Sequence, residues 1–248
     1  MDEGTLRARL WDGFARLQLL LGGHAGKGHT LERDGLVASI VPNAPDSPTL
    51  NAAVAIDSQA AQDHFEELER RYREGSIRRW GIWLDGDATV AAQALARRQM
   101  VVTTASPGMG AALDELPNDT AERVHADLAT VGRVNDLAYG NYDGRLERTL
   151  TPLPNGVLHG YKVELDGAPA AVALALHHGQ DAGISFVATI PKARRRGLAT
   201  QVMHQALHEA REEGCTTTTL QATDVGERLY TNLGYRRLTI MQLWERRP

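Results

Sequence analysis

Cysteine, long apolar runs and a secretion signal are the features that this sequence of 248 residues has little of or lacks. Cys215 is the only cysteine, which excludes an internal disulfide and any metal site built from several thiolates. It follows Gly214 at the end of a helical pattern, so we expect a small buried side chain there and no nucleophile. No stretch approaches the roughly 18 uncharged apolar residues of a membrane span, and the first residues place charges inside their apolar part, unlike a secretion signal. We therefore expect a cytoplasmic protein without a membrane partner.

An excess of basic charge is also lacking. The formal net charge is -4 and the isoelectric point is near 6.1, so nucleic acid is not expected as a partner. Hydrophobic residues make up 42% and charged residues 23% of the chain, which is typical of a globular protein. The length favours two domains of about 120 residues each.

Hydrophobic periodicity predicts a mixed α/β chain whose two halves repeat one order of elements. Strand, helix, strand, helix, strand occurs over residues 50–105 and again over 182–244, which suggests an internal duplication of the fold. The predicted elements of the first half are a helix at 5–21, a turn at 22–29, strands at 35–41 and 50–56, a helix from Ser58 to Arg73, a strand at 77–84, a helix at 87–98 and a strand at 100–105. Those of the second half are a helix from Thr120 to Tyr139, a looser segment to Pro154, strands at 156–165, 169–178 and 182–189, a helix at 198–213, a strand at 216–222, a helix at 225–233 and a strand at 235–244. Residues 106–119, rich in glycine, proline and acids, are predicted to connect two domains.

Three consecutive arginines, Arg194, Arg195 and Arg196, stand directly before Gly197 and the helix predicted to begin at Leu198. The first backbone N-H groups of a helix lack partners inside it, and the helix dipole adds positive charge there, so such an end binds anions. A glycine without a side chain lets a diphosphate approach the backbone. The pattern therefore indicates either a diphosphate site or an exposed basic turn, and spacing alone leaves both open.

At this point the sequence resembles a family. Arg194-x-x-Gly197-x-Ala199 is similar to the acetyl-coenzyme A (acetyl-CoA) pattern (Q/R)-x-x-G-x-(G/A) of the GNAT superfamily of N-acetyltransferases. The stretch GERLYTNLGY (226–235) resembles the LYxxLGF element of the same superfamily and follows at the expected distance. The resemblance covers residues 120–248 and implies a tandem GNAT (acyl-CoA N-acyltransferase) fold of two similar domains.

The resemblance implies which residues bind the acetyl donor. The strand before the loop splays from its neighbour, and the pantetheine arm bonds to backbone groups of Val187 and Thr189. The implied cofactor-binding residues are Val187, Ala188, Thr189, Arg194, Arg195, Arg196, Gly197, Leu198, Ala199 and Thr200. No metal is expected to take part.

The resemblance also assigns the chemistry at the sulfur. Tyr230 would protonate the departing thiolate, because a tyrosine pKa near 10 is not far above that of a thiol; the alternative is a packing role beside Leu229 and Leu233. Many relatives carry a glutamate as general base where this chain has Ser185, which cannot serve as a base at neutral pH. A titrating group at a strand end, His177, His178 or Asp181, is one substitute, and water or an already neutral amine is another. His204 and His208 lie one helical turn apart, without a third metal ligand in the pattern.

The first half departs from the family at both motifs. The counterpart of the arginine loop is DSQAA (57–61), and ALARRQM (94–100) lacks the tyrosine and glycine of the second motif. We therefore expect residues 1–115 to form a degenerate GNAT-like domain that helps to shape the acceptor pocket, and residues 120–248 to form the acetyl-CoA-binding domain.

The implied function is direct acetyl transfer from acetyl-CoA to a primary amine of a small molecule, which makes the protein an acyltransferase. The alternatives are an acetyltransferase for lysine or N-terminal amines of proteins or peptides, and an acyl-CoA sensor without catalysis, which the absent glutamate at Ser185 favours. Asp136, Tyr142 and Asp143 are candidates for attracting the amine. The sequence is compatible with an oligomer.

Overall fold

The computed structural model describes residues 1–118, 122–154 and 156–246 and divides into two compact units. The large unit combines Met1–Gly13 with Met109–Arg236, and the small unit combines Phe14–Gly108 with the chain from Arg237 onward. Each unit is therefore built from two segments that are distant in sequence. No helix among the described residues is long and apolar enough to cross a membrane.

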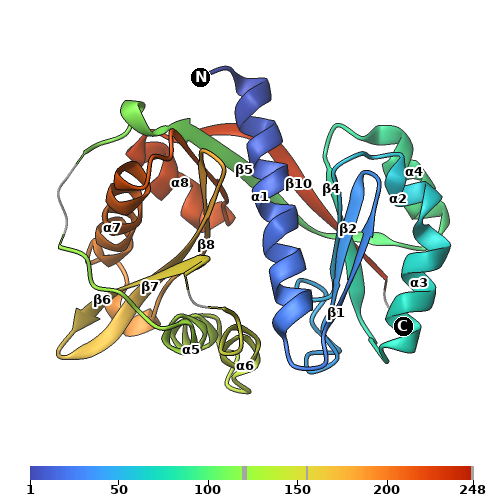
Figure 1. Ribbon diagram of the computed structural model, residues 1–248, viewed down its shortest axis with the longest axis horizontal. Coiled ribbons are helices and arrows are strands. Elements are labelled where there is room, and N and C mark those ends of the chain that lie inside the picture. The colour runs from blue at the N-terminus through green and yellow to red at the C-terminus, as the bar shows by residue number, and fades with distance from the viewer. Residues whose placement is uncertain (119–121, 155, 247–248) are drawn as a thin grey trace. The chain divides into compact units, whose positions relative to one another are not determined.

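The small unit is a mixed sheet covered by helices. Its strand order is β1-β2-β3-β4-β10-β5. Its elements are the second part of α1 (Glu3–His24), β1 (His29–Arg33), β2 (Leu36–Ile40), β3 (Ala52–Ala55), α2 (Ala60–Asp63), α3 (Phe65–Glu74), β4 (Trp80–Asp85), α4 (Thr89–Arg97), the first part of β5 (Val101–Ala112) and β10 (Arg236–Arg246). The chain's last strand thus lies between two strands of the first half (Figure 1).

The large unit has the strand order β5-β9-β8-β7-β6. Its further elements are η1 (Leu113–Glu115), α5 (Leu128–Tyr139), α6 (Arg145–Leu150), β6 (Leu158–Leu165), β7 (Ala168–His178), β8 (Asp181–Thr189), η2 (Pro191–Ala193), α7 (Leu198–Glu212), β9 (Thr217–Gln221) and α8 (Asp224–Leu233). The β6–β7 hairpin closes at Asp166 and Gly167, whose φ angles of 54° and 76° are those of a type I′ turn, as the sequence predicts.

Helices α5 and α7 lie on opposite faces of this sheet because the side chains of β6 alternate between its faces. A Cβ on Gly160 would meet Val131 of α5, whereas the neighbouring His159 bonds to Glu209 of α7. The face under α7 holds the main core of the unit, to which the helix contributes side chains with 0% exposure: Val202, Met203, Ala206, Leu207 and Ala210. This packing fixes α7 against the strands that carry the predicted site.

Matching helix ends support the predicted duplication of the fold. In the large unit, Cys215 N-H donates to Ala210 O after α7, and Tyr235 N-H donates to Tyr230 O after α8. The small unit repeats both bonds, from Ile77 to Tyr72 after α3 and from Met100 to Leu95 after α4. Each is the 6→1 bond of a helix that ends in a left-handed residue, and the four left-handed residues are Gly214, Gly234, Ser76 and Gln99.

The predicted connection at 106–119 contains the passage between the two units, at Gly108 and Met109, but this passage is a strand and not a loop; residue 119 lies outside the described residues. Strand β5 runs to Ala112 and a 3₁₀ turn follows, with Met109 and Ala111 each only 1% exposed. The prediction was wrong because glycine and proline were taken as loop formers, whereas here small residues occupy a buried strand. The predicted boundary at 115–120 placed the first residues in the first domain and the last residues in the second. In the structure, Met1–Gly13 belongs to the large unit and the chain from Arg237 onward to the small unit.

Three helix boundaries differ from the predicted ones. The helix at 58–73 is interrupted at His64, which separates α2 from α3. The helix expected from Thr120 begins at Leu128, where the Asp127 carboxylate accepts the N-H of Thr130 at 2.6 Å; Thr120 itself lies outside the described residues. Helix α1 continues to His24, into the predicted turn.

Candidate functional site

The strands β8 and β9 separate halfway along β8. They pair in parallel from Asp181 opposite Thr217 to Ile184 opposite Leu220. Beyond Ile184, β8 continues to Thr189 with only β7 as its partner among the described residues. The structure therefore has the splay that the family resemblance implies, and among the described residues it leaves one side of this part of β8 without a neighbouring strand.

A bulge in β8 sets which backbone groups face this gap. Phe186 has a φ of 51°, the register against β7 shifts between Val172 and Leu174, and Asn135 Nδ2 donates to Phe186 O at 3.4 Å.

Beyond the bulge, Ile190 N-H donates to Ala170 O of β7. Since backbone groups alternate sides along a strand, those of Ala188 face β7 and those of Val187 and Thr189 face the gap. Of the three β8 residues predicted to bind the cofactor, Ala188 is turned away.

The loop after β8 leads to a helix end without a side-chain cap. Gly197 precedes α7 with a φ of 76°, and among the described residues no side chain caps this end. A Cβ on Gly197 would meet nothing within 4 Å, so glycine is favoured there by backbone conformation and not by lack of space. The N-H groups of Leu198, Ala199 and Thr200 lie in the first turn, where helical bonding leaves them free. The Leu198 side chain is buried in a small core cluster, which leaves its backbone as the accessible part.

The three arginines of the loop have different roles. Arg194 donates from Nε to Thr189 O at 3.1 Å and from Nη2 to Ala138 O at 2.7 Å, so its side chain holds the loop against β8 and the end of α5. Arg195, at a φ of 59°, and Arg196 are exposed and form no ion pair with any carboxylate in the described part of the chain. Of the three arginines, Arg195 and Arg196 are therefore the ones whose side chains are free to meet a ligand.

Tyr230 lies on α8 in the core under α7 and is 6% exposed. Its ring contacts Tyr235 edge to face at 5.9 Å, and Gly226 leaves it room, because a Cβ there would lie 3.2 Å from the ring. Burial raises the pKa of Tyr230 above its ordinary range, and Tyr139 adds to the rise. Tyr230 therefore keeps its proton at neutral pH. Both the packing role and the acid role that the sequence suggested are compatible with this position.

The titratable groups considered as bases lie at the other end of β8. His177 contacts Glu213 at 2.5 Å, His178 contacts Asp12 at 2.8 Å, and the buried Asp181 accepts bonds from Thr217 and Thr219 at 2.6 Å each.

Ser185 stands where β8 and β9 part, half-buried. Asp181 is four residues away along the strand, about 13 Å at 3.3 Å per residue. His177, His178 and Asp181 therefore bond to other side chains at the end of β8 away from the gap.

The two acids suggested for attracting the amine are each engaged by other groups of the protein. Asp136 is buried and accepts the N-H groups of Leu146 and Glu147, both at 3.0 Å, so it caps α6. Tyr142 is 85% exposed, and Asp143 pairs with Arg145 at 3.1 Å. Burial raises the pKa of Asp136, whereas the bond from Arg145 lowers that of Asp143. Cys215 is buried as expected, and its burial raises the thiol pKa to about 11.

In the small unit, the connection from β3 to α2 is the counterpart of the arginine loop, and its described residues do not form a free helix end. After β3, the Asp57 carboxylate accepts Gln59 N-H at 2.9 Å and the Asp57 carbonyl accepts Ala60 N-H. A negative side chain thus occupies the place where α7 has a free, positive end. β3 also ends at Ala55, just past its paired residues, so no splayed extension follows.

Residues 123–235 match a family model described as the Acetyltransferase (GNAT) family. A comparison with curated proteins found no match. Among solved structures, a GCN5-related N-acetyltransferase from Kribbella flavida has a TM-score of 0.70 at 19% identity and covers 96% of this chain and 94% of its own. An acetyltransferase of the GNAT family from Novosphingobium aromaticivorans has a TM-score of 0.57 at 19% identity, covering 87% and 89%. A tandem GNAT protein from the clavulanic acid biosynthesis pathway has a TM-score of 0.56 at 13% identity, covering 85% and 78%.

The chain is a mixed α/β protein with the tandem GNAT fold, since these structures match it over most of its length. Its segment 123–235 belongs to the GNAT acetyltransferase family, whose members are enzymes that use acetyl-CoA as the acetyl donor. The acceptor is the part of the reaction that these comparisons leave open.

Proposed function

We propose that this protein transfers an acetyl group from acetyl-CoA directly to a primary amine of a small molecule. The observation that carries the proposal is the coincidence, at one end of β8, of a gap between parallel strands and an uncapped helix end preceded by Gly197. A negatively charged diphosphate suits that end of α7, and an extended polar arm suits the free edge of β8. Acetyl-CoA carries both groups in the required order.

Each part of the site has a distinct task in this reaction. The N-H groups of the first turn of α7 bind the diphosphate, with Arg195 and Arg196 adding charge and Arg194 fixing the loop. The backbone of Val187 and Thr189 bonds to the pantetheine arm. Acetyl-CoA supplies the thioester, whose carbonyl carbon the amine attacks. As the C–S bond breaks, the sulfur takes a proton from the Tyr230 hydroxyl, the nitrogen loses its extra proton to water, and Tyr230 regains a proton from water.

The transfer is direct in this proposal because the one cysteine of the chain lies away from the thioester. Cys215 is buried, its thiol pKa is raised, and it follows the C-terminal end of α7, whereas the loop lies at the other end. Ser185 does not replace the glutamate base of relatives, so the amine reaches the site in its neutral form. The domain assignment, with a degenerate first half and the donor site in the second, is part of the same proposal.

The test offers acetyl-CoA to the full chain with a panel of small primary amines and with lysine peptides, and follows the release of free thiol. We expect release with at least one small amine and none with peptides. Release with peptides alone would make the protein a peptide acetyltransferase. Binding of acetyl-CoA without thiol release from any acceptor would identify a sensor and overturn the catalytic proposal.

A further inference from the structure

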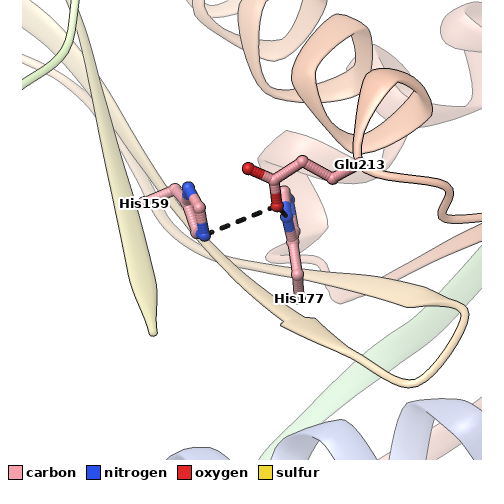
Figure 2. Close-up of side chains that lie close together, drawn as sticks. All are labelled: His159, His177 and Glu213. Carbon is pink, nitrogen blue, oxygen red and sulfur yellow. Dashed lines mark hydrogen bonds and ion pairs between the residues drawn. The ribbon is translucent and has the colours of Figure 1, made fainter. Parts of the chain in front are cut away.

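Two histidines and a glutamate converge on the face of the large unit that α7 covers. His159 comes from β6, His177 from β7 and Glu213 from the residue after α7 (Figure 2). Glu213 Oε2 lies 2.5 Å from His177 Nδ1 and 3.8 Å from His159 Nε2, and one ligand atom from each side chain lies within 4.8 Å of the other two. These are the residue types that bind zinc in proteins.

The register of the hairpin brings the two imidazoles together. His159 pairs with Ala175, so His177 is its diagonal neighbour on the same face of the sheet. The rings stack with centroids 4.3 Å apart and planes 19° from parallel. The His177 side chain is 10% exposed and that of His159 17%, whereas that of Glu213 is 43% exposed. The cluster is thus held by two ordered strands and open to solvent on the side of the glutamate.

A buried carboxylate orients one of the imidazoles. Glu209 Oε1 lies 2.9 Å from His159 Nδ1, which leaves Nε2 of the ring pointing to Glu213. A carboxylate hydrogen-bonded to the other ring nitrogen is typical of metal-binding histidines.

Two buried atoms near the cluster have no hydrogen-bond partner among the described residues: Glu209 Oε2, which lies 3.6 Å from His125 Nε2, and His177 Nε2. Neither of them faces Glu213. The ring nitrogens that converge on the Glu213 carboxylate are His159 Nε2 and His177 Nδ1.

We propose that His159, His177 and Glu213 form a Zn²⁺ site, with water in the fourth position. Two imidazoles and one carboxylate are ligands for Zn²⁺ and neighbouring transition metals, whereas Mg²⁺ and Ca²⁺ prefer oxygen alone. Bonds of about 2.0–2.2 Å in a tetrahedron set the ligand atoms about 3.3 Å apart. The contact of Glu213 with His177 must widen by about 0.8 Å, and that with His159 must shorten by about 0.5 Å. The exposed side chain of Glu213 can make both changes. One of the two stacked imidazoles must also rotate about its side-chain bonds, because each ring binds a metal in its own plane.

The proposed metal would link the β6–β7 hairpin to the C-terminal end of α7. The arginine loop lies at the opposite end of this 15-residue helix, which is about 22 Å long. The metal would therefore stabilise the large unit without contacting the acetyl donor, and the inference is independent of the proposed function.

The experiment uses the untagged full chain, freed of metal by a chelator, and titrates it with ZnCl₂ in a calorimeter. We expect saturable binding of one Zn²⁺ per chain, a rise in melting temperature, and no effect of Mg²⁺. The variants His177→Gln and Glu213→Gln should weaken binding by more than about 10-fold, and Glu209→Gln by about 10- to 100-fold. The matched control is His208→Gln, because His208 pairs with Glu212 on the same helix at 3.4 Å but lies outside the cluster.

Co²⁺ provides a spectroscopic readout of the coordination geometry in the folded chain. We expect the wild-type chain to give the visible absorption of tetrahedral Co²⁺, which Zn²⁺ displaces. Glu213→Gln changes an exposed side chain and should leave the fold and the binding of CoA intact. Absence of saturable Zn²⁺ binding by the wild-type chain, or equal affinity in the Glu213→Gln and wild-type chains, would overturn the proposal.

Discussion

Replacing Gly197 with aspartate tests the anion site at the start of α7. A Cβ there meets nothing within 4 Å, so the cost to the fold is that of a side chain at a φ of 76°, about 1–2 kcal/mol and least for Asn or Asp. At an effective dielectric constant of ~20 and a separation of about 5 Å, the added carboxylate and one phosphate charge repel by about 3 kcal/mol. Repulsion from the nearer phosphate alone weakens acetyl-CoA binding on the order of 100-fold.

Gly197→Asn is the matched control, because it adds the same shape in the same backbone conformation without the charge. Calorimetric titration with CoA measures both variants, and thermal unfolding verifies that they fold. The difference between them should shrink at high salt, since salt screens exposed charges. Equal affinity for CoA in the Asp and Asn variants would refute the placement of the diphosphate.

Three further predictions concern the loop, the chemistry and the buried acid. Changing both Arg195 and Arg196 to alanine should weaken CoA binding about 10-fold and reduce its salt dependence, and an unchanged salt dependence would contradict their role. Tyr230→Phe should lower kcat about 100-fold with little change in KM for acetyl-CoA. In the wild-type enzyme, kcat/KM for each amine should rise with pH up to the pKa of that amine. One ionisation at pH 6–8 that is the same for all amines would instead indicate a base on the enzyme. Burial raises the pKa of Asp181 in the folded protein, so the folded state holds the proton more tightly than the unfolded chain. The contribution of Asp181 to the free energy of unfolding should fall as pH rises from about 3.9 through the folded pKa. In urea unfolding, the free energy of the wild type minus that of Asp181→Asn should therefore fall over this range.

Local pattern was enough to predict the parts of the site that are close in sequence. Apolar spacing located α7, Gly197 marked its start, and the pair of Asp166 and Gly167 marked the hairpin turn, each within one or two residues. These features depend on backbone conformation and on one amphipathic face, which neighbouring residues determine. Family resemblance added the splay of β8, which no local pattern contains.

Strand pairing between distant segments could not be predicted from local pattern. β5 extends through a stretch of glycine and proline because its small side chains are buried in a sheet, and β10 pairs with β4 of the other half of the chain. β1 was missed because only Leu31 of its five residues is buried, so it has the composition of a loop. The bonds from Arg194 to Thr189 and Ala138 likewise depend on tertiary placement, and they distinguish it from the free Arg195 and Arg196.

The cluster of His159, His177 and Glu213 shows the same limit. The three residues are separated by 18 and 36 positions in the sequence, and no metal-binding spacing links them. Only the diagonal register of β6 and β7 and the end of α7 bring them together. The signal available in the sequence was the predicted hairpin, which placed His159 and His177 on adjoining strands.

A crystal structure of the full chain with bound CoA is the most direct test of the site. The account predicts the diphosphate on the N-H groups of Leu198, Ala199 and Thr200, with the pantetheine arm along Val187 and Thr189 and the sulfur near the Tyr230 hydroxyl. A diphosphate bound elsewhere, with the first turn of α7 exposed to water, would contradict it.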